Sequence, residues 1–314
     1  MSGYALTSRQ FTLLALLTIT WGLNWPVMKV GVTGYPPLTF RSLSMWLGLP
    51  VLWAVTAVLK VPLRIERKDW REVGLLTVTN MLVWHVFAIL AVQALSSGRA
   101  AILGYTMPIW SALWGLQLYG QRLRPRQIGG IGAAGVGVLL LLWHELAHFA
   151  GRPLAALGML FAAAIWALGT QQLRHTRIAA PTLAIVFWMT LITTLAMTFL
   201  AIVLEHGIWI APPPQTWAAI GYNAVLIFGF AQAIWLVLAR DLPPIASTMS
   251  VMLIPVLGTL SGAWWLGEQL HWQDGAAIVL LGIAIAAVMW PRRAAAAGAG
   301  AKPPVRSDHA DRAA

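Results

Sequence analysis

One stretch of the chain has the spacing of a zinc hydrolase, His144-Glu145-Leu146-Ala147-His148. In the pattern H-E-x-x-H, two histidines one helical turn apart bind zinc and the glutamate acts as a base. A membrane metalloprotease is therefore one hypothesis. Only three positions are specified, however, and a third ligand would have to come from Glu205, His206 or Glu268, which nothing holds nearby. A polar helix end accounts for the same residues, so we expect neither a metal site nor an enzyme.

A second group consists of uncharged polar side chains and aromatic rings in the middle of long apolar runs. Amide and imidazole groups are costly in lipid and should face the interior of a helix bundle. A mid-run tryptophan is not explained by anchoring at the membrane surface, so it either packs or lines a cavity. An aromatic chamber with neutral hydrogen-bonding groups suits a zwitterion with an apolar or aromatic side chain, or a planar organic cation. The candidate substrate-binding residues are Trp21, Asn24, Asn80, Trp84, His85, Tyr105, Trp110, Trp166 and Asn223.

The composition requires a membrane to cover these runs. Hydrophobic residues make up 59% of the 314 and charged residues 10%, against about 45–50% and 25% in soluble domains. The absence of cysteine excludes disulfides and thiolate metal sites. The net charge of +11 comes from basic residues in short loops, so it predicts membrane topology and not a nucleic-acid partner. We expect membrane lipids and a small-molecule substrate as partners, no cofactor, and a monomer.

Apolar runs long enough for a membrane helix recur along the chain and predict an all-α polytopic protein with ten transmembrane helices. With the N-terminus in the cytoplasm, 17 Lys and Arg residues fall inside and four outside, namely Lys29, Arg41, Arg99 and Arg152. This asymmetry predicts a cell (inner or plasma) membrane protein with both termini cytoplasmic. The expected helices are 11–30, 38–59, 73–95, 100–119, 128–143, 154–173, 181–204, 216–238, 245–266 and 275–290.

The second half of the sequence repeats the first. At an offset of 147, residues 108–143 align with 255–290 without a gap and eight positions are identical. An offset of 143 pairs Asn80 with Asn223, and one of 145 pairs Trp21 with Trp166. Five helices per repeat is an odd number, so the halves must insert in opposite orientations, as in secondary transporters. We expect one repeat in 1–150, the inverted repeat in 151–291 and a disordered cytoplasmic tail in 292–314.

Three prolines inside expected helices are candidate hinges. Each removes a backbone hydrogen bond and clashes with the preceding turn, so a kink is expected. Packing alone explains many such kinks, but two of these prolines are related by the repeat and are better candidates for hinge or pocket positions. The hinge candidates are Pro26, Pro108 and Pro255.

Short motifs within these helices resemble a known family. Trp21-Gly22-Leu23-Asn24-Trp25-Pro26, Trp166-Ala167-Leu168-Gly169-Thr170 and Leu266-Gly267-Glu268-Gln269-Leu270 resemble the drug/metabolite transporter (DMT) superfamily, EamA type, over about residues 10–292. The resemblance implies ten helices in inverted five-helix repeats and export of amino acids or other metabolites. The many aromatics look most like the aromatic amino-acid exporter branch. The first half carries Gln121 where the family often has Glu. The resemblance therefore implies no role for a carboxylate at this position.

The acidic residues bear on energy coupling. All ten fall in expected loops, the tail or the ends of helices, whereas ion coupling usually rests on a titratable group inside the membrane. His85 is the one mid-helix group that titrates near neutral pH, and packing is its commoner role. We therefore expect a facilitator or uniporter that works by alternating access. A proton-coupled drug or organic-cation exporter is the alternative.

Overall fold

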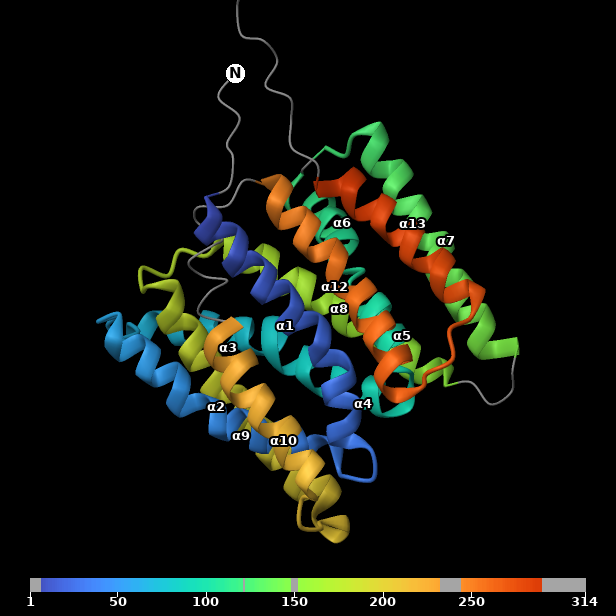
Figure 1. Ribbon diagram of the computed structural model, residues 1–314. Helices are drawn as coiled ribbons and strands as arrows, with labels where there is room; N and C mark the ends of the chain where they lie inside the picture. Colours follow the sequence, from blue (N-terminus) through green and yellow to red (C-terminus); the bar gives the residue numbers. More distant parts are fainter. Residues whose placement is uncertain (1–6, 121, 148–151, 232–243, 290–314) are drawn as a thin grey trace, which may run out of the picture.

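The computed structural model describes residues 7–120, 122–147, 152–231 and 244–289, and every regular element among them is helical (Figure 1). At 144–147, 244–252 and 288–289 only the backbone is described. The helices are α1 (Ser8–Val32), α2 (Pro37–Val58), η1 (Arg67–Asp69), α3 (Trp70–Thr77), η2 (Val78–Leu82), α4 (Val83–Ala94), α5 (Ser97–Gly104), α6 (Met107–Tyr119), α7 (Pro125–Ala147), α8 (Pro153–His175), α9 (Thr182–Glu205), η3 (His206–Ile208), α10 (Pro214–Tyr222), η4 (Asn223–Ala231), α12 (Pro244–Leu266) and α13 (Trp272–Met289).

Where their residues are described, the expected membrane helices coincide with helical structure, but three differ from the simple α-helices that the sequence predicts. Residues 232–238 of the eighth, residue 290 of the tenth and the predicted tail at 292–314 lie outside the described residues. The third and eighth contain π-helical segments, η2 and η4, which begin near Asn80 and at Asn223. The fourth is divided into α5 and α6 at Tyr105 and Thr106. Pro108 is the reason for the division, because it has no N–H to donate to the carbonyl of Gly104.

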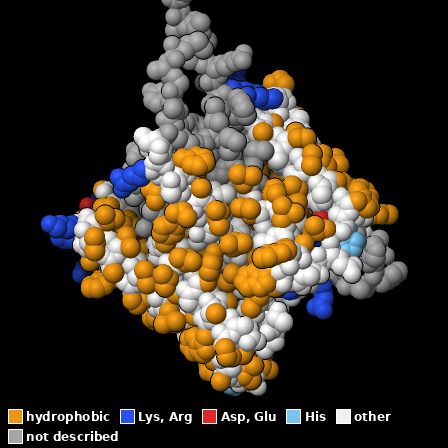
Figure 2. All heavy atoms as spheres, in the orientation of Figure 1, with side chains coloured by type: hydrophobic (Ala, Val, Ile, Leu, Met, Phe, Trp, Pro, Cys, Tyr) orange, Lys and Arg blue, Asp and Glu red, His pale blue; other side chains and the backbone are white. Residues whose placement is uncertain are grey.

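The outer surface of the bundle is apolar. Among the described residues, six helical stretches are long and apolar enough to cross a membrane, and Leu253–Leu266 and Trp272–Ala287 are shorter apolar helices. Hydrophobic side chains cover much of the face in Figure 2, while Lys and Arg lie toward its edges. Large side chains such as Trp264, Trp143 and Phe199 are more than half exposed. Such a surface is stable only in lipid, so the chain is a polytopic α-helical membrane protein.

Small residues bring α7 and α13 together along one edge of the bundle (Figure 1). A Cβ atom on Gly130 would lie 2.7 Å from Ala287 Cβ and 3.1 Å from the carbonyl oxygen of Ala284. One on Gly137 would lie 3.5 Å from Ala277 Cα. Glycine therefore lets the two backbones approach closely, as is typical of helix pairs in membranes.

Acidic side chains from distant parts of the chain bind the N-termini of two helices. Glu205, at the end of α9, accepts hydrogen bonds from the backbone N–H groups of Leu38 (2.9 Å) and Thr39 (2.7 Å) in α2. Burial and the nearby Glu205 carboxylate raise the pKa of the Tyr35 phenol in the preceding loop. Glu268 accepts from the backbone N–H (2.7 Å) and hydroxyl (2.8 Å) of Ser97 in α5. Both carboxylates thus satisfy helix N–H groups that have no partner within the helix.

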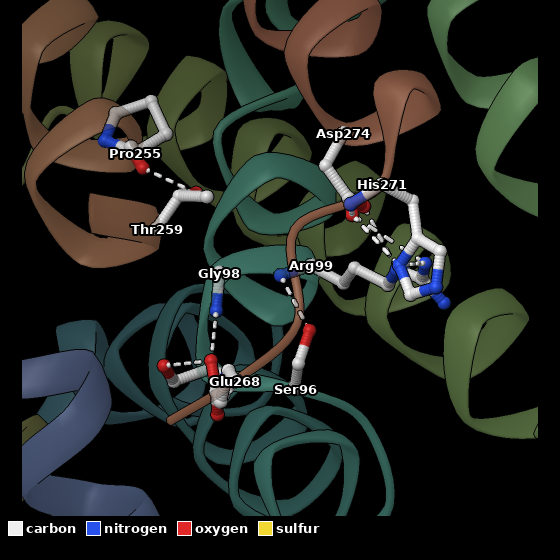
Figure 3. Close-up of polar contacts among 9 residues, drawn as sticks. Ser96, Gly98, Arg99, Pro255, Thr259, Glu268, His271 and Asp274 are labelled. Atoms are coloured by element: carbon white, nitrogen blue, oxygen red, sulfur yellow. Dashed lines mark hydrogen bonds and ion pairs between the residues drawn. The ribbon is translucent and has the colours of Figure 1, made fainter. Parts of the chain in front are cut away.

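Basic groups complete the same end of the bundle. Lys29 donates to the carbonyls of Val92, Gln93 and Leu95 at the end of α4, at 2.7–3.0 Å. Arg99 in α5 pairs with Asp274 in α13, with 2.8 Å between Nε and Oδ1 (Figure 3). These contacts join α1 to α4 and α5 to α13 where the chain turns between helices.

Candidate substrate-binding site

The first part of the site lies between α4, η2 and α8. Asn80 donates from Nδ2 to the carbonyl of Trp166 (3.2 Å) and to the Thr170 hydroxyl (3.0 Å). The rings of Trp84 and Trp166 lie 6.1 Å apart at a tilt of 49°. Gly169 permits this approach, since a Cβ there would lie 2.7 Å from the Asn80 backbone nitrogen. Three predicted residues, Asn80, Trp84 and Trp166, are therefore brought together.

A second aromatic group adjoins the first around Gly104, the last residue of α5. A Cβ on Gly104 would contact the rings of Trp84 and Trp25 at 3.1 and 3.2 Å. Trp25 in turn meets Tyr105 edge to face, with ring centroids 6.4 Å apart. Tyr105 is therefore part of a continuous aromatic cluster with Trp84 and Trp166. Trp25, buried in α1, was not among the predicted residues; its place next to Asn24 is the signal that could have indicated it.

Asn223 belongs to a third group, between η4, α2 and α1. The side chain is fully buried, and its Oδ1 accepts a hydrogen bond from the guanidinium of Arg41 at 3.2 Å. Nδ2 of Asn223 donates to the carbonyl of Ala219. Arg41 also contacts the sulfur of Met28 in α1. The distribution of basic residues predicts Arg41 as a topology signal outside the membrane. That prediction is corrected here, because the side chain is 3% exposed and points into the bundle.

Three buried polar atoms near these groups have no hydrogen-bond partner: Oδ1 of Asn24, Nδ1 of His85 and Nε of Arg41. His85 is adjacent to Trp84 in sequence but packs on Phe228 of η4, with ring centroids 5.7 Å apart. Unpartnered buried polar atoms are uncommon in native proteins and often mark places where water or a ligand binds. The set includes two predicted residues, Asn24 and His85.

Two predicted residues are less closely tied to these groups. Trp21 is half-buried on α1 and packs against core residues of the bundle. Trp110 is half-buried on α6. Of the hinge candidates, Pro26 and Pro255 lie inside α1 and α12, and Pro108 stands at the start of α6. A hinge role for them stays a prediction.

The metalloprotease motif falls largely outside the described residues. His148 is not described, and for His144 and Glu145 only the helical backbone at the end of α7 is. Two of the residues considered as a third ligand have other roles, because Glu205 and Glu268 bind the N-termini of α2 and α5. Among the described residues no group of three or more His, Asp or Glu side chains could hold a metal ion.

Comparison with known proteins identifies the family. The model of the EamA-like transporter family matches the chain twice, over residues 10–143 and 153–290. The chain belongs to the EamA-like transporter family. This confirms the resemblance to the drug/metabolite transporter superfamily that the motifs indicate.

Curated relatives of this EamA-like transporter are named as transporters or efflux pumps. The "Probable amino-acid metabolite efflux pump" of Escherichia coli (strain K12) is 27% identical over 88% of this chain and 95% of its own length. The protein of the same name from Salmonella typhimurium is 28% identical over 88% of this chain and 95% of its own length. The "Uncharacterized transporter YoaV" of Bacillus subtilis (strain 168) is 23% identical over 84% and 89%.

A solved structure shares the fold. It covers 91% of this chain and 99% of its own, with a TM-score of 0.63 and 23% sequence identity, and its title reads "Crystal structure of protein". At this identity the similarity supports the fold alone.

Proposed function

We propose that this EamA-like transporter exports small metabolites, most simply neutral or aromatic amino acids, through the interior of the bundle. The observation that carries the proposal is the aromatic and amide cluster between α1, α4, α5 and α8, next to unpartnered atoms of Asn24 and His85. Aromatic faces and neutral hydrogen-bonding groups suit an apolar side chain with a polar end. The names of the two efflux-pump relatives agree with export of amino-acid metabolites.

We further propose that residues 1–150 and 151–291 form two inverted five-helix repeats. The twofold match of the family model supports this. The contacts of α7 with α13 also support it. Gly130 contacts Ala284, and the repeat offset of 147 relates Gly130 to Ala277 and Ala284 to Gly137, which are also in contact. Such an exchange is expected of halves related by a pseudo-twofold axis. Alternating access would then arise as the two halves rock about the site, with the kinks at Pro26, Pro108 and Pro255 as hinges.

Transport in this proposal needs no ion. Among the described residues, acidic side chains have partners elsewhere: Glu205 and Glu268 at helix N-termini, Asp274 with Arg99, Glu66 with Lys68, and Glu72 with the Thr176 hydroxyl. None of these is at the depth where a coupling ion would meet the substrate. The chain is accordingly proposed as a facilitator with cytoplasmic termini in the inner membrane.

Proteoliposomes test the function directly. Vesicles loaded with one of the twenty amino acids, without a pH, Na⁺ or voltage gradient, should show net efflux that saturates. Trp166→Ala should raise the half-saturation concentration about fivefold, since a ring contact contributes about 1 kcal/mol. Trp264→Ala, at a side chain 89% exposed, is the matched control and should leave the curve unchanged.

Three outcomes would count against the proposal. Unchanged saturation curves for both Trp166→Ala and Asn80→Ala would move the site elsewhere. Accumulation against the substrate gradient, driven by a pH step and lost in His85→Gln, would replace facilitation by proton coupling. Efflux of organic cations alone would favour the alternative drug exporter, which the buried positive charge of Arg41 disfavours.

A further inference from the structure

We propose that Arg41 binds the carboxylate of the transported solute. This inference rests on the proposed transport function and names the chemical class of its substrate: carboxylic acids, including amino acids. It does not follow from the aromatic cluster, which would accept an apolar amine or an uncharged molecule equally well.

The burial of Arg41 is the first step of the argument. It is the fifth residue of α2, and its side chain is 3% exposed although lipid and the membrane surface are both close. A guanidinium this near a helix end usually extends to the membrane surface, where its charge remains hydrated. Arg41 instead extends inward toward Met28 of α1 and Asn223 of η4.

The second step is that the charge is not neutralised by the described part of the protein. Its described contacts are a neutral amide oxygen and a thioether, and Nε has none. Glu205, the acidic side chain that caps this helix, is hydrogen-bonded to Leu38 and Thr39. An ionised group inside a membrane protein ordinarily pairs with an opposite charge or marks a substrate path. A guanidinium fork with a free N–H is the donor set that binds a carboxylate through two parallel hydrogen bonds.

The third step is the surroundings. Asn24 lies one helical turn from Met28 on the same face of α1, and its buried Oδ1 also lacks a partner. His85, with an unpartnered Nδ1, is held against η4 by Phe228. An acceptor at Asn24 and a charged donor at Arg41 are complementary to the ammonium and carboxylate groups of a zwitterion. The aromatic cluster begins at Trp25, next to Asn24, and would receive the side chain.

Three ligands that differ only in their charged groups test the assignment: L-phenylalanine, 3-phenylpropionate, which lacks the ammonium group, and phenethylamine, which lacks the carboxylate. Binding to the purified full-length protein in detergent is followed by thermal stabilisation. We expect phenylalanine and 3-phenylpropionate to bind and phenethylamine to bind at least tenfold more weakly, as is typical when a charge-assisted hydrogen bond is lost.

Two variants remove the site by different means. Arg41→Met removes the charge, and Asn223→Asp supplies an internal carboxylate 3.2 Å from the guanidinium. Both should weaken 3-phenylpropionate about tenfold or more. Asn223→Asp should also raise the melting temperature, because it pairs a buried charge, so lost binding in that variant is not lost folding. Arg64→Met removes an exposed arginine and is the control that should bind normally.

Normal binding of 3-phenylpropionate by Asn223→Asp would overturn the assignment and leave Arg41 a packing residue. Equal binding of phenethylamine and phenylalanine would also overturn it. So would a wild-type protein that binds neither 3-phenylpropionate nor any of the twenty amino acids. Efflux of uncharged small metabolites that lack a carboxylate would keep the proposed export function and reject the role of Arg41. Carboxylate binding that depends on Arg41, with no flux of any bound solute, would keep the role of Arg41 and reject the proposed transport function.

Discussion

Replacement of Glu205 by alanine should destabilise the protein through the beginning of α2, 166 residues away in sequence. Four N–H groups at a helix start lack partners within the helix. In α2, Pro37 has no N–H, Phe40 donates to the Pro36 carbonyl, and Leu38 and Thr39 donate to the Glu205 carboxylate. Glu205 is 5% exposed, so water would reach the vacated groups poorly.

The magnitude follows from these contacts. Glu205→Ala leaves two buried or half-buried N–H groups and the Thr39 hydroxyl without an acceptor, at about 1–3 kcal/mol for each buried group. Allowing for partial relaxation, we expect a loss of about 3 kcal/mol in the free energy of unfolding. Glu205→Gln keeps one amide oxygen as an acceptor and should lose about half as much.

Unfolding in mixed micelles by increasing SDS, followed by circular dichroism, measures the difference. Glu66→Ala, which removes an exposed carboxylate paired with Lys68, is the control and should be unchanged. Equal losses for Glu205→Ala and Glu66→Ala would refute the reasoning. A second readout is Tyr35: without the Glu205 charge its pKa should fall in Glu205→Gln, yet stay above the usual 10.0 because burial remains. Subtracting the tyrosinate absorbance of a Tyr35→Phe variant isolates the titration of Tyr35.

Three further predictions test topology and packing. A cysteine at Glu66 in this Cys-free chain should react with a permeant reagent and not with an impermeant one added outside intact cells; impermeant labelling would reverse the topology. Gly130→Leu should destabilise the α7–α13 pair, whereas Gly132→Leu should not, because the space around a Cβ at Gly132 is open. Equal melting temperatures for the two variants would contradict the close packing. Asp274→Asn breaks the buried ion pair with Arg99 and should lower the free energy of unfolding by about 3 kcal/mol in the same SDS titration. An unchanged free energy of unfolding would mean that the pair is not needed for stability.

The helices could be predicted from sequence because lipid leaves the backbone few alternatives to helix. The same argument predicted that Asn80 and Asn223 face inward, and both form hydrogen bonds to residues on other helices. The division of the fourth helix could be predicted in part. Pro108 indicated a kink, and the carbonyl left without a donor at Gly104 became a break between α5 and α6.

Other features depend on which side chains meet in space, and local patterns do not contain that information. The charge count places Arg41 among the basic residues outside the membrane, and only the packing of α1 and η4 on α2 shows that its side chain points inward. The π-helical turns at η2 and η4 carry no distinctive residue type. Glu205 and Glu268 read as ordinary acids at helix ends, since their partners are 166 to 171 residues away.

These distant caps have a consequence for biogenesis. As the chain leaves the ribosome, α2 and α5 enter the membrane well before Glu205 and Glu268 have been synthesised. Until then their first N–H groups must be satisfied by water or by the insertion machinery. A fragment that ends near residue 150 would keep that exposed polar backbone permanently and would be a target for membrane proteases. Co-expression with a second fragment from residue 151 onward would supply both carboxylates and should protect it.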